Sequence, residues 1–206
     1  MKVSVIIPVW NQEELIIKAL DSIPEREDIE AIVIDDGSTD GTRNAVKDYM
    51  AAHLDKNIRL FVFKTNKGVS AACNKGLEKA SGEYVVLLGS DDYFLTDEFL
   101  KAIDLLDGTD LVYFNLRIND KSLYHLTEAT KNYFCGSTKF MRRAFIKGLR
   151  YPEEKKAGED WYFNNELQAR KPTETFSGLT VKHYNFPREG SLVDLRKRGI
   201  IKGAEV

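Results

Sequence analysis

The sequence is short of the features that define several protein classes. It has 206 residues and only two cysteines, Cys73 and Cys135, too few for a disulfide framework or a cysteine-based zinc cluster. This cysteine usage fits a reduced compartment, and we expect a cytoplasmic protein. The first apolar run, Val3 to Ile7, is shorter than the core of a signal peptide. No run approaches the ~20 apolar residues that cross a bilayer, so we expect no integral membrane segment.

The sequence also lacks a strong charge of either sign. Its formal net charge is −2, so the composition as a whole attracts neither nucleic acid nor an anionic membrane. Hydrophobic residues make up 43% and charged residues 30%, which is ordinary for a folded globular protein. The length suits one compact domain better than two. We therefore expect a single domain over residues 1–206.

The first half alternates short apolar runs with segments that have the apolar spacing of amphipathic helices. The runs are rich in Val, Ile, Leu and Phe without a polar alternate face, as in strands buried on both sides. Repeated strand–helix–strand units predict an α/β fold with a mainly parallel, twisted sheet and helices on both faces. The strands expected are Val3–Ile7, Ala31–Ile34, Arg59–Phe63 and Tyr84–Leu88.

From about residue 110 the pattern becomes less regular. Leu111–Leu116 and Leu179–Tyr184 have the composition of strands. The basic segment Thr138–Lys147 is predicted to be helical, and a further helix is expected to begin near Glu159. Neither an internal repeat nor a low-complexity linker divides the chain.

Polar, acid-bearing loops follow three of the expected strands. They contain Asn11, the pair Asp35-Asp36 and the pair Asp91-Asp92. Each loop taken singly could be a simple turn or a helix cap. Because the carboxyl ends of parallel strands meet at one edge of a sheet, we expect the three loops to converge there. Clustered carboxylates at such an edge suit a hard cation that bridges a diphosphate. Adjacent residues on an extended chain point in opposite directions, so only one of Asp91 and Asp92 is expected to ligate the cation directly.

Two common nucleotide-binding motifs are missing. The first strand is followed by Pro8-Val9-Trp10-Asn11, where a dinucleotide-binding protein would have its glycine-rich turn. A phosphate-cradling GxxxxGK[ST] loop does not occur anywhere in the sequence. These absences argue against a dehydrogenase and against a P-loop kinase.

Four segments follow one another along the chain: VSVIIPVWNQEELIIKALDSI, VIDDGSTDGT, NKGVSAACNKGLEKASGEYVVLLGSDD and GEDWYF. In this order they resemble the family 2 glycosyltransferases, whose catalytic domain has the GT-A fold. The resemblance covers nearly the whole chain and implies an inverting transferase. It would take a sugar from a nucleoside diphosphate sugar, with UDP as the expected nucleotide and Mn²⁺ or Mg²⁺ as cofactor. Residues up to about 110 would bind the donor, and residues 111–206 the acceptor.

The resemblance also implies roles for individual residues. Asp91 is expected to bind the metal. His183 is a second candidate metal ligand, and a structural histidine is the alternative. Asp160 is expected to be the general base, with Glu159 in reserve; both also suit the first turn of any helix. The residues expected at the donor are Pro8, Trp10, Asn11, Asp35, Asp36, Lys67, Gly68, Asn74, Ser90, Asp92 and Arg188.

Two positions depart from the family pattern. Gly89 stands where the family usually has an aspartate, so that Ser90 or Asp92 would have to substitute. Cys73 stands where the family tends to have an arginine, and its place on the apolar stripe of a helix favours a small core residue. The departures motivate an alternative function as a nucleotide-sugar-binding pseudoenzyme or a non-catalytic subunit of a glycosyltransferase complex.

A third function, a nucleotidyltransferase that makes the sugar nucleotide, is disfavoured. Such an enzyme would have a glycine-rich loop with basic residues after the first strand. Pro8-Val9-Trp10-Asn11 contains no glycine and no basic residue. The acceptor stays open among a glycan, a lipid-linked molecule, a protein, a small molecule and a nucleic acid base.

Overall fold

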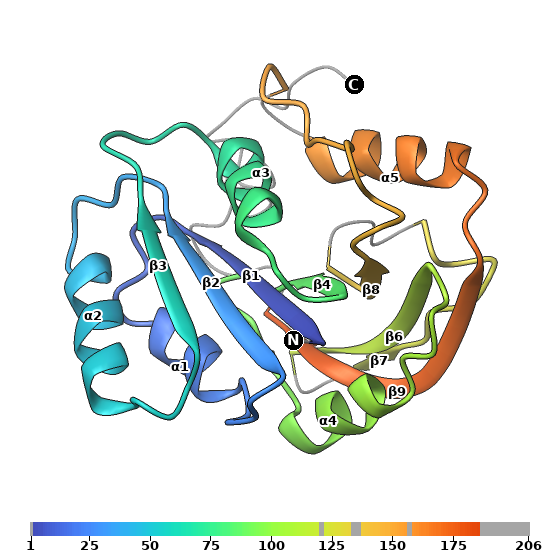
Figure 1. Ribbon diagram of the computed structural model, residues 1–206, viewed down its shortest axis with the longest axis horizontal. Coiled ribbons are helices and arrows are strands. Elements are labelled where there is room, and N and C mark those ends of the chain that lie inside the picture. The colour runs from blue at the N-terminus through green and yellow to red at the C-terminus, as the bar shows by residue number, and fades with distance from the viewer. Residues whose placement is uncertain (1, 120–121, 133–136, 156–157, 186–206) are drawn as a thin grey trace.

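The computed structural model describes residues 2–119, 122–132, 137–155 and 158–185. Strands and helices alternate through the first half, as the sequence predicts (Figure 1). The strands are β1 (Val3–Val9), β2 (Ile29–Asp35), β3 (Ile58–Val62), β4 (Tyr84–Leu87), β5 (Tyr93–Phe94), β6 (Leu111–Ile118), β7 (Ser122–Tyr124), β8 (Lys139–Arg142) and β9 (Glu174–Tyr184). The helices are α1 (Ile16–Asp21), α2 (Thr42–Ala52), α3 (Val69–Lys79), α4 (Thr96–Asp104) and α5 (Glu159–Ala169).

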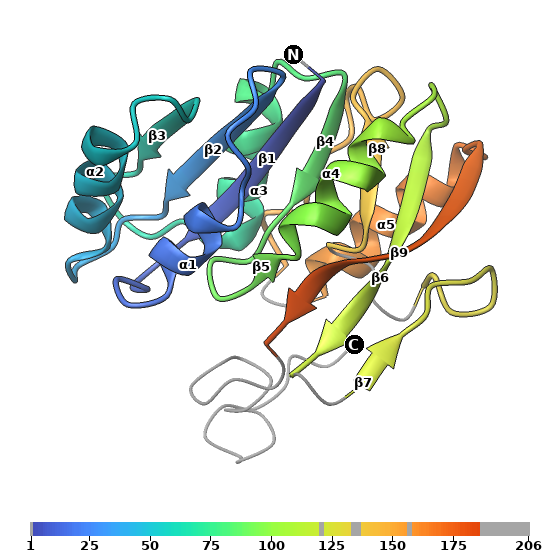
Figure 2. The ribbon, with the colours of Figure 1, turned by 90° about the horizontal axis from the view of Figure 1, so that it is seen from below.

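All of these strands belong to one sheet, in the order β3-β2-β1-β4-β8-β6-β9-β5, and β7 pairs with β6 beside this path. The first four strands pair in parallel. The second half is mixed, because β8 runs antiparallel to both β4 and β6 whereas β9 is parallel to β6. Figure 2 shows β9 curving from its start beside β6 to its end near β5. The predicted α/β fold with a twisted sheet is confirmed.

Helices cover both faces of the sheet. Figure 1 shows α3 and α5 above the sheet and α1, α2 and α4 below it. Every residue of β2 and β4 is buried, since these strands lie inside the sheet with helices on either side. The core is built from the branched side chains of β1, β2 and β4, such as Ile6, Val33 and Val86, which are fully buried. The inner strands therefore present their carboxyl ends as a rigid edge.

Two expectations for individual segments are wrong. Strand β3 is not buried on both sides, because it is the outermost strand of the sheet and its residues are half-buried or exposed. Residues 138–147 do not form a helix. Lys139–Arg142 is instead strand β8, because its main chain completes the hydrogen-bonded ladder between β4 and β6. Phe140 and Met141 are both buried, since their side chains enter opposite, helix-covered faces of the sheet.

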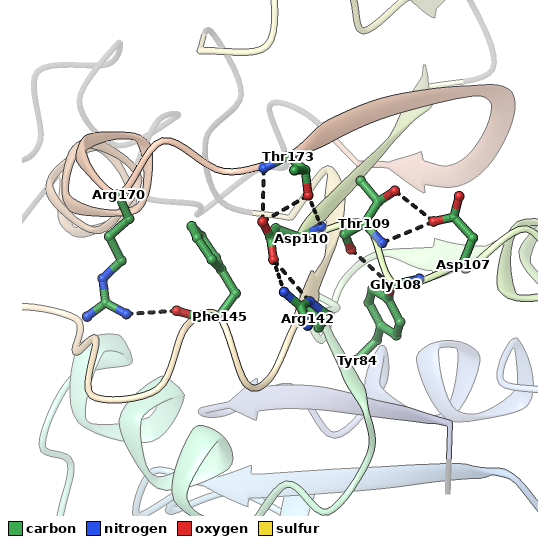
Figure 3. A network of polar contacts seen from close by, with 9 residues as sticks. All are labelled: Tyr84, Asp107, Gly108, Thr109, Asp110, Arg142, Phe145, Arg170 and Thr173. Carbon is green, nitrogen blue, oxygen red and sulfur yellow. Dashed lines mark hydrogen bonds and ion pairs between the residues drawn. The ribbon is translucent and has the colours of Figure 1, made fainter.

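The buried carboxylate of Asp110 connects segments of the second half of the sheet. Asp110 precedes β6, and its side chain accepts hydrogen bonds from the amide and hydroxyl of Thr173, both at 2.9 Å. It also accepts two from the Arg142 guanidinium, at 3.0 and 2.5 Å (Figure 3). Burial opposes ionisation of Asp110. The Thr173 amide and the Arg142 guanidinium outweigh that effect and hold the pKa of the carboxyl below its ordinary value.

Replacing Asp110 with Asn should lower the free energy of unfolding by about 1–3 kcal/mol near neutral pH, because charge-assisted hydrogen bonds to two segments are lost. Since the folded-state pKa is lowered, the stabilisation is present above the ordinary carboxyl pKa of 3.8 and disappears as the pH falls through the folded-state value. Urea denaturation over a pH series measures both effects. The exposed Asp48→Asn change is the control, and an equal loss in both variants would contradict the assignment.

Candidate active site

The first two polar loops lie side by side at the carboxyl edge of the sheet. Val9 and Asp35 are partners at the ends of β1 and β2, and the amide of Asp36 donates to the Val9 carbonyl at 2.8 Å. Pro8 is half-buried within β1, and the next residue but one, Trp10, is 51% exposed. An exposed indole at the end of a buried strand is suited to stack on a flat ring.

Asn11 joins these two loops. It has a left-handed backbone with φ of 50°, a conformation that asparagine tolerates better than most residues. Its amide donates to the Ser38 hydroxyl at 3.0 Å, and its side-chain oxygen accepts from the Thr39 amide at 2.9 Å. The loop after β1 and the loop after β2 therefore form one rigid unit.

The two acids after β2 hold neighbouring segments. Asp35 is fully buried, and its carboxylate accepts from the Ser38 amide at 2.8 Å and from Arg43 at 3.0 Å. Asp36 accepts from the amides of Lys67 and Gly68 at 2.7 and 2.8 Å. Burial raises the pKa of Asp36, helped by the charge of Asp35 and opposed by those two amides. Asp36 thus fixes the start of α3.

Helix α3 begins at this edge with an open N-terminus. Gly68 precedes it with φ of 92°, and nothing lies within 4 Å of the point where a Cβ would stand. The Lys67 side chain is exposed. Six residues after Gly68, Asn74 is buried and binds the second half, because its amide donates to the Tyr151 carbonyl and the Glu153 carboxylate, each at 2.9 Å. The structure therefore brings Lys67 and Gly68 to the edge and uses the Asn74 side chain to hold the segment before α5.

The loop after β4 carries the third group of acids. Asp92 is 3% exposed and accepts from the fully buried Lys182 ammonium at 2.8 Å and from the Asn185 amide at 2.9 Å. Burial raises the pKa of Asp92, and the Lys182 charge opposes the shift. Asp91 is half-buried and Ser90 is buried. Asp92 therefore has a buried cation as its partner, whereas Asp91 lies in the turn before it and is less buried.

Helix α5 presents Glu159 and Asp160 in its first turn, directly after Gly158. Its rotation is set by buried polar contacts on the same face. One turn after Asp160, the Asn164 carboxamide accepts from the buried Lys139 ammonium at 2.9 Å. A further turn on, Gln168 donates to the hydroxyl of Tyr113 at 3.0 Å. These contacts hold the helix whose first turn carries Asp160.

Acids from both halves of the chain influence the hydroxyl of Tyr184. The pKa of its hydroxyl is raised, first by burial and then by the charges of Asp92, Asp91 and Asp160. Burial likewise raises the pKa of the Cys73 thiol, with contributions from Asp160 and Glu159. The loop after β4 and the first turn of α5 therefore lie around the same space. Cys73 is part of the core, as expected.

Two candidates are not placed with these acids. The His183 ring stacks on Tyr93 with centroids 4.4 Å apart. Because successive side chains of a strand point to opposite faces, His183 lies on the face of β9 away from Lys182 and Tyr184. Arg188 lies outside the described residues.

Sequence reasoning did not single out Lys182 or Tyr184 as site residues. A signal for Lys182 exists, because a lysine inside a strand whose neighbours are apolar needs a buried carboxylate as a partner. Nothing in the sequence says which carboxylate that is, since the pair lies 90 residues apart.

The comparisons with known proteins identify the family. The model of "Glycosyl transferase family 2" matches residues 4–161. The chain belongs to glycosyltransferase family 2. An uncharacterised glycosyltransferase of Haemophilus influenzae is 33% identical over 177 residues, which are 78% of this chain and 69% of that protein.

Solved glycosyltransferases share the GT-A fold of this family 2 member. TarS of Staphylococcus aureus, a poly(ribitol-phosphate) β-N-acetylglucosaminyltransferase, is 29% identical over 92% of this chain, which spans only 36% of TarS. TarS residues 1–349 in complex with UDP-GlcNAc give a TM-score of 0.81 at 27% identity, over 93% of this chain and 60% of the fragment. A mannosyltransferase of Pyrobaculum calidifontis, solved with GDP-Man and Mn²⁺, has the same fold at 23% identity and a TM-score of 0.73.

The glycine that departs from the family 2 pattern has a structural reason. A Cβ on Gly89 would stand 2.9 Å from Asp92 Oδ2 and 3.0 Å from Asp91 Oδ1, closer than side chains tolerate. The Asp92 carboxylate cannot retreat easily, because Lys182 and the Asn185 amide hold it. Gly89 therefore leaves room for two carboxylates that approach one point.

The residues present suit a divalent cation whose other ligands would come from the bound substrate and water. In the described part of the chain, no three His, Cys, Asp or Glu side chains gather as a metal site. Magnesium in phosphate-transfer sites is held by one or two carboxylates, with substrate phosphates and waters as its other ligands. Asp91, beside the point that both carboxylates approach, meets that smaller requirement.

Replacing Lys182 with Met should lower the free energy of unfolding by about 3–5 kcal/mol, because Asp92 would keep a buried charge without its partner. The double variant Asp92→Asn/Lys182→Met removes both charges and should recover much of that loss. Urea denaturation of the two variants beside the wild type measures the difference. Equal losses in the single and double variants would mean that the pair is not the stabilising unit.

Proposed function

We propose that this chain is an inverting glycosyltransferase. It moves a sugar from a nucleoside diphosphate sugar, UDP-linked, to an acceptor hydroxyl, with Mn²⁺ or Mg²⁺ and with Asp160 as the general base. The observation that carries the proposal is that, after burial, the charges of Asp92 and Asp91 from the loop after β4 and of Asp160 from α5 all raise the pKa of the same hydroxyl, that of Tyr184. Membership of glycosyltransferase family 2 indicates glycosyl transfer as the reaction class. The acids would supply one carboxylate to hold the metal and one to take the proton of the acceptor hydroxyl.

The donor would lie along the carboxyl edge of the first half. Trp10 offers the exposed ring face for the base, beside the rigid unit that Asn11 forms with Ser38 and Thr39. The open start of α3, at Lys67 and Gly68, faces the same edge and supplies positive charge for phosphates. The TarS complex with UDP-GlcNAc, at 27% identity, supports UDP as the nucleotide.

Asp160 would take the proton from the acceptor hydroxyl. The freed oxygen attacks the anomeric carbon on the face opposite the diphosphate, so the new C–O bond forms as the bond to the leaving diphosphate breaks. The departing diphosphate keeps the electron pair, and the anomeric configuration inverts. The rigid attachment of α5 through Asn164 and Lys139 holds the carboxylate in place for this step.

A divalent metal, when bound with the donor, would stabilise the negative charge of the leaving diphosphate. Asp91 would hold it as the protein carboxylate, while Asp92 keeps its bonds to Lys182 and Asn185. His183 is not included, because its ring lies on the other face of β9. The acceptor would meet the second half, next to Trp161, whose side chain is 52% exposed beside Asp160.

One observation favours a second candidate, a nucleotide-sugar-binding pseudoenzyme or supporting subunit. Of the acids after β4, Asp92 is tied to Lys182, and Gly89 supplies no carboxylate where the family usually has one. A site that has fewer carboxylates than the family pattern could bind the donor without transferring it. Activity measurements on the chain alone separate the two functions.

Titration with UDP, GDP, CDP and dTDP, with and without Mn²⁺, should raise the Tm only for one nucleotide, and more strongly with the metal. A ligand at about 100 times its Kd adds about 2.7 kcal/mol to the stability of the folded state. For a chain of this length that corresponds to a rise of about 5–10 °C. If the folded protein responds to none of the four, the donor site is absent and the transferase proposal fails.

Replacing Asp160 with Asn should leave the nucleotide-induced rise in Tm unchanged and lower kcat by about 10²–10⁴, because only the proton acceptor is lost. Release of UDP from the donor sugar, to the acceptor or to water, reports the rate. Glu166→Gln, on an exposed position of α5, is the matched control and should keep full activity. Near-normal transfer by the Asp160→Asn variant, with loss in Glu159→Gln instead, would assign the base to Glu159.

A further inference from the structure

A second surface with its own chemistry lies at the far end of α3 from the donor edge. The C-terminal half of the helix and the loop of residues 143–150 enclose a groove of about 430 Å³. Its floor is apolar, with Leu77, Ile146 and Leu149. Its rim carries Arg143, Lys147 and Arg150, all exposed. The only acid among the lining residues is Glu78, and it is paired with Lys75 and Lys79 at 3.1 and 3.0 Å.

The arginines here donate hydrogen bonds to main-chain carbonyl oxygens. Arg143 donates to the Gly82 carbonyl at 2.6 Å, and Arg150 to the Asn74 carbonyl at 3.4 Å. Arg170, next to the groove, donates to the carbonyl of Phe145 at 2.7 Å (Figure 3) and to that of Lys147 at 3.0 Å. Neutral carbonyl oxygens hold these guanidinium groups without cancelling their charge.

Four of the other five arginines in the described chain are used differently, because Arg26, Arg43, Arg59 and Arg142 form ion pairs with carboxylates. The fifth, Arg117 on β6, is exposed and takes no part in these ion pairs. Within the described residues, no ion pair involves Arg143, Arg150 or Arg170. With Lys147, these three arginines therefore gather positive charge around one groove of a chain whose formal net charge is −2.

Local structure accounts for only part of this charge. The negative end of the α3 dipole favours lysines in its last turn, such as Lys79. It does not account for Lys147 and Arg150, which come from a separate loop, or for the position of Arg150 beside Asn74, in the middle of the helix. With a rise of about 1.5 Å per residue, Asn74 and Ala80 lie about 9 Å apart along α3. The cations are spread over that length and beyond it to Gly82.

We propose that this groove binds a polymer that carries phosphate groups along its length. Arginine is the side chain best suited to phosphate oxygens, because its planar fork donates two parallel hydrogen bonds. Cations spread over two turns of helix match several phosphates in a row better than one anion. The concave shape and the apolar floor favour a chain lying in the groove over a flat bilayer surface. The site is separate from the donor edge and shares no residue with it.

The test uses short-chain inorganic polyphosphate as the probe and the full chain with UDP and Mn²⁺ present. Lys147→Glu should weaken polyphosphate binding by at least about tenfold and reduce its salt dependence, because one phosphate contact is lost. Lys47→Glu, an equal charge change at an exposed position of α2, should leave the Kd within about twofold. Melting temperatures confirm that both variants fold.

Several results would overturn the proposal. Equal weakening by Lys147→Glu and Lys47→Glu would mean diffuse attraction to the whole protein. Inorganic phosphate that competes as well as polyphosphate, mole for mole, would mean a single-anion site. Binding to phosphatidylglycerol vesicles through Lys147 without binding to polyphosphate would assign the surface to a membrane. If only the nucleotide-induced rise in Tm were missing, the transferase proposal would fail, while polyphosphate binding in the groove would still be supported.

Discussion

The arrangement of the site depends on one buried ion pair, between Asp92 and Lys182. Both side chains are almost completely removed from water, so each charge is tolerable only because the other is within hydrogen-bond distance. The pair joins the loop after β4 to β9 and, through the Asn185 amide, fixes the point at which β9 ends. It also explains why a glycine stands at position 89, where a larger residue would press on the Asp92 carboxylate. A departure from the family pattern thus has its cause in packing.

Most of the fold of the first half could be predicted from local pattern alone, because β1, β2 and β4 are buried on both faces and the helices are amphipathic. The second half could not. Strand β8 contains Lys139 and Arg142, which look like the polar positions of a helix, but Lys139 is buried against Asn164 and Arg142 pairs with Asp110. Only the partners, distant in sequence, make these residues compatible with a strand. The exposed position of β3 likewise depends on sheet order, which short-range pattern does not contain.

The candidate site, like the fold, could be predicted only in part. The sheet edge that carries Asn11, Asp36 and Asp91 follows from parallel strands, and Asp160 at the start of α5 follows from resemblance. What each side chain contacts did not follow. The Asn74 amide binds Tyr151 because a segment 77 residues further along the chain packs against α3, and His183 stacks on Tyr93 because β9 pairs with β5. Such facts are properties of the assembled sheet.

The sequence separation of Asp92 and Lys182 also has a consequence for biosynthesis. During translation, β4 and its acidic loop leave the ribosome long before β9 does, since 90 residues separate the paired side chains. Until β9 docks between β6 and β5, the Asp92 carboxylate has no cation beside it and the loop has no anchor. Docking of a strand from so far along the chain is a slow, non-local step. The nascent chain therefore cannot complete the Asp92–Lys182 pair before β9 has been synthesised and has docked.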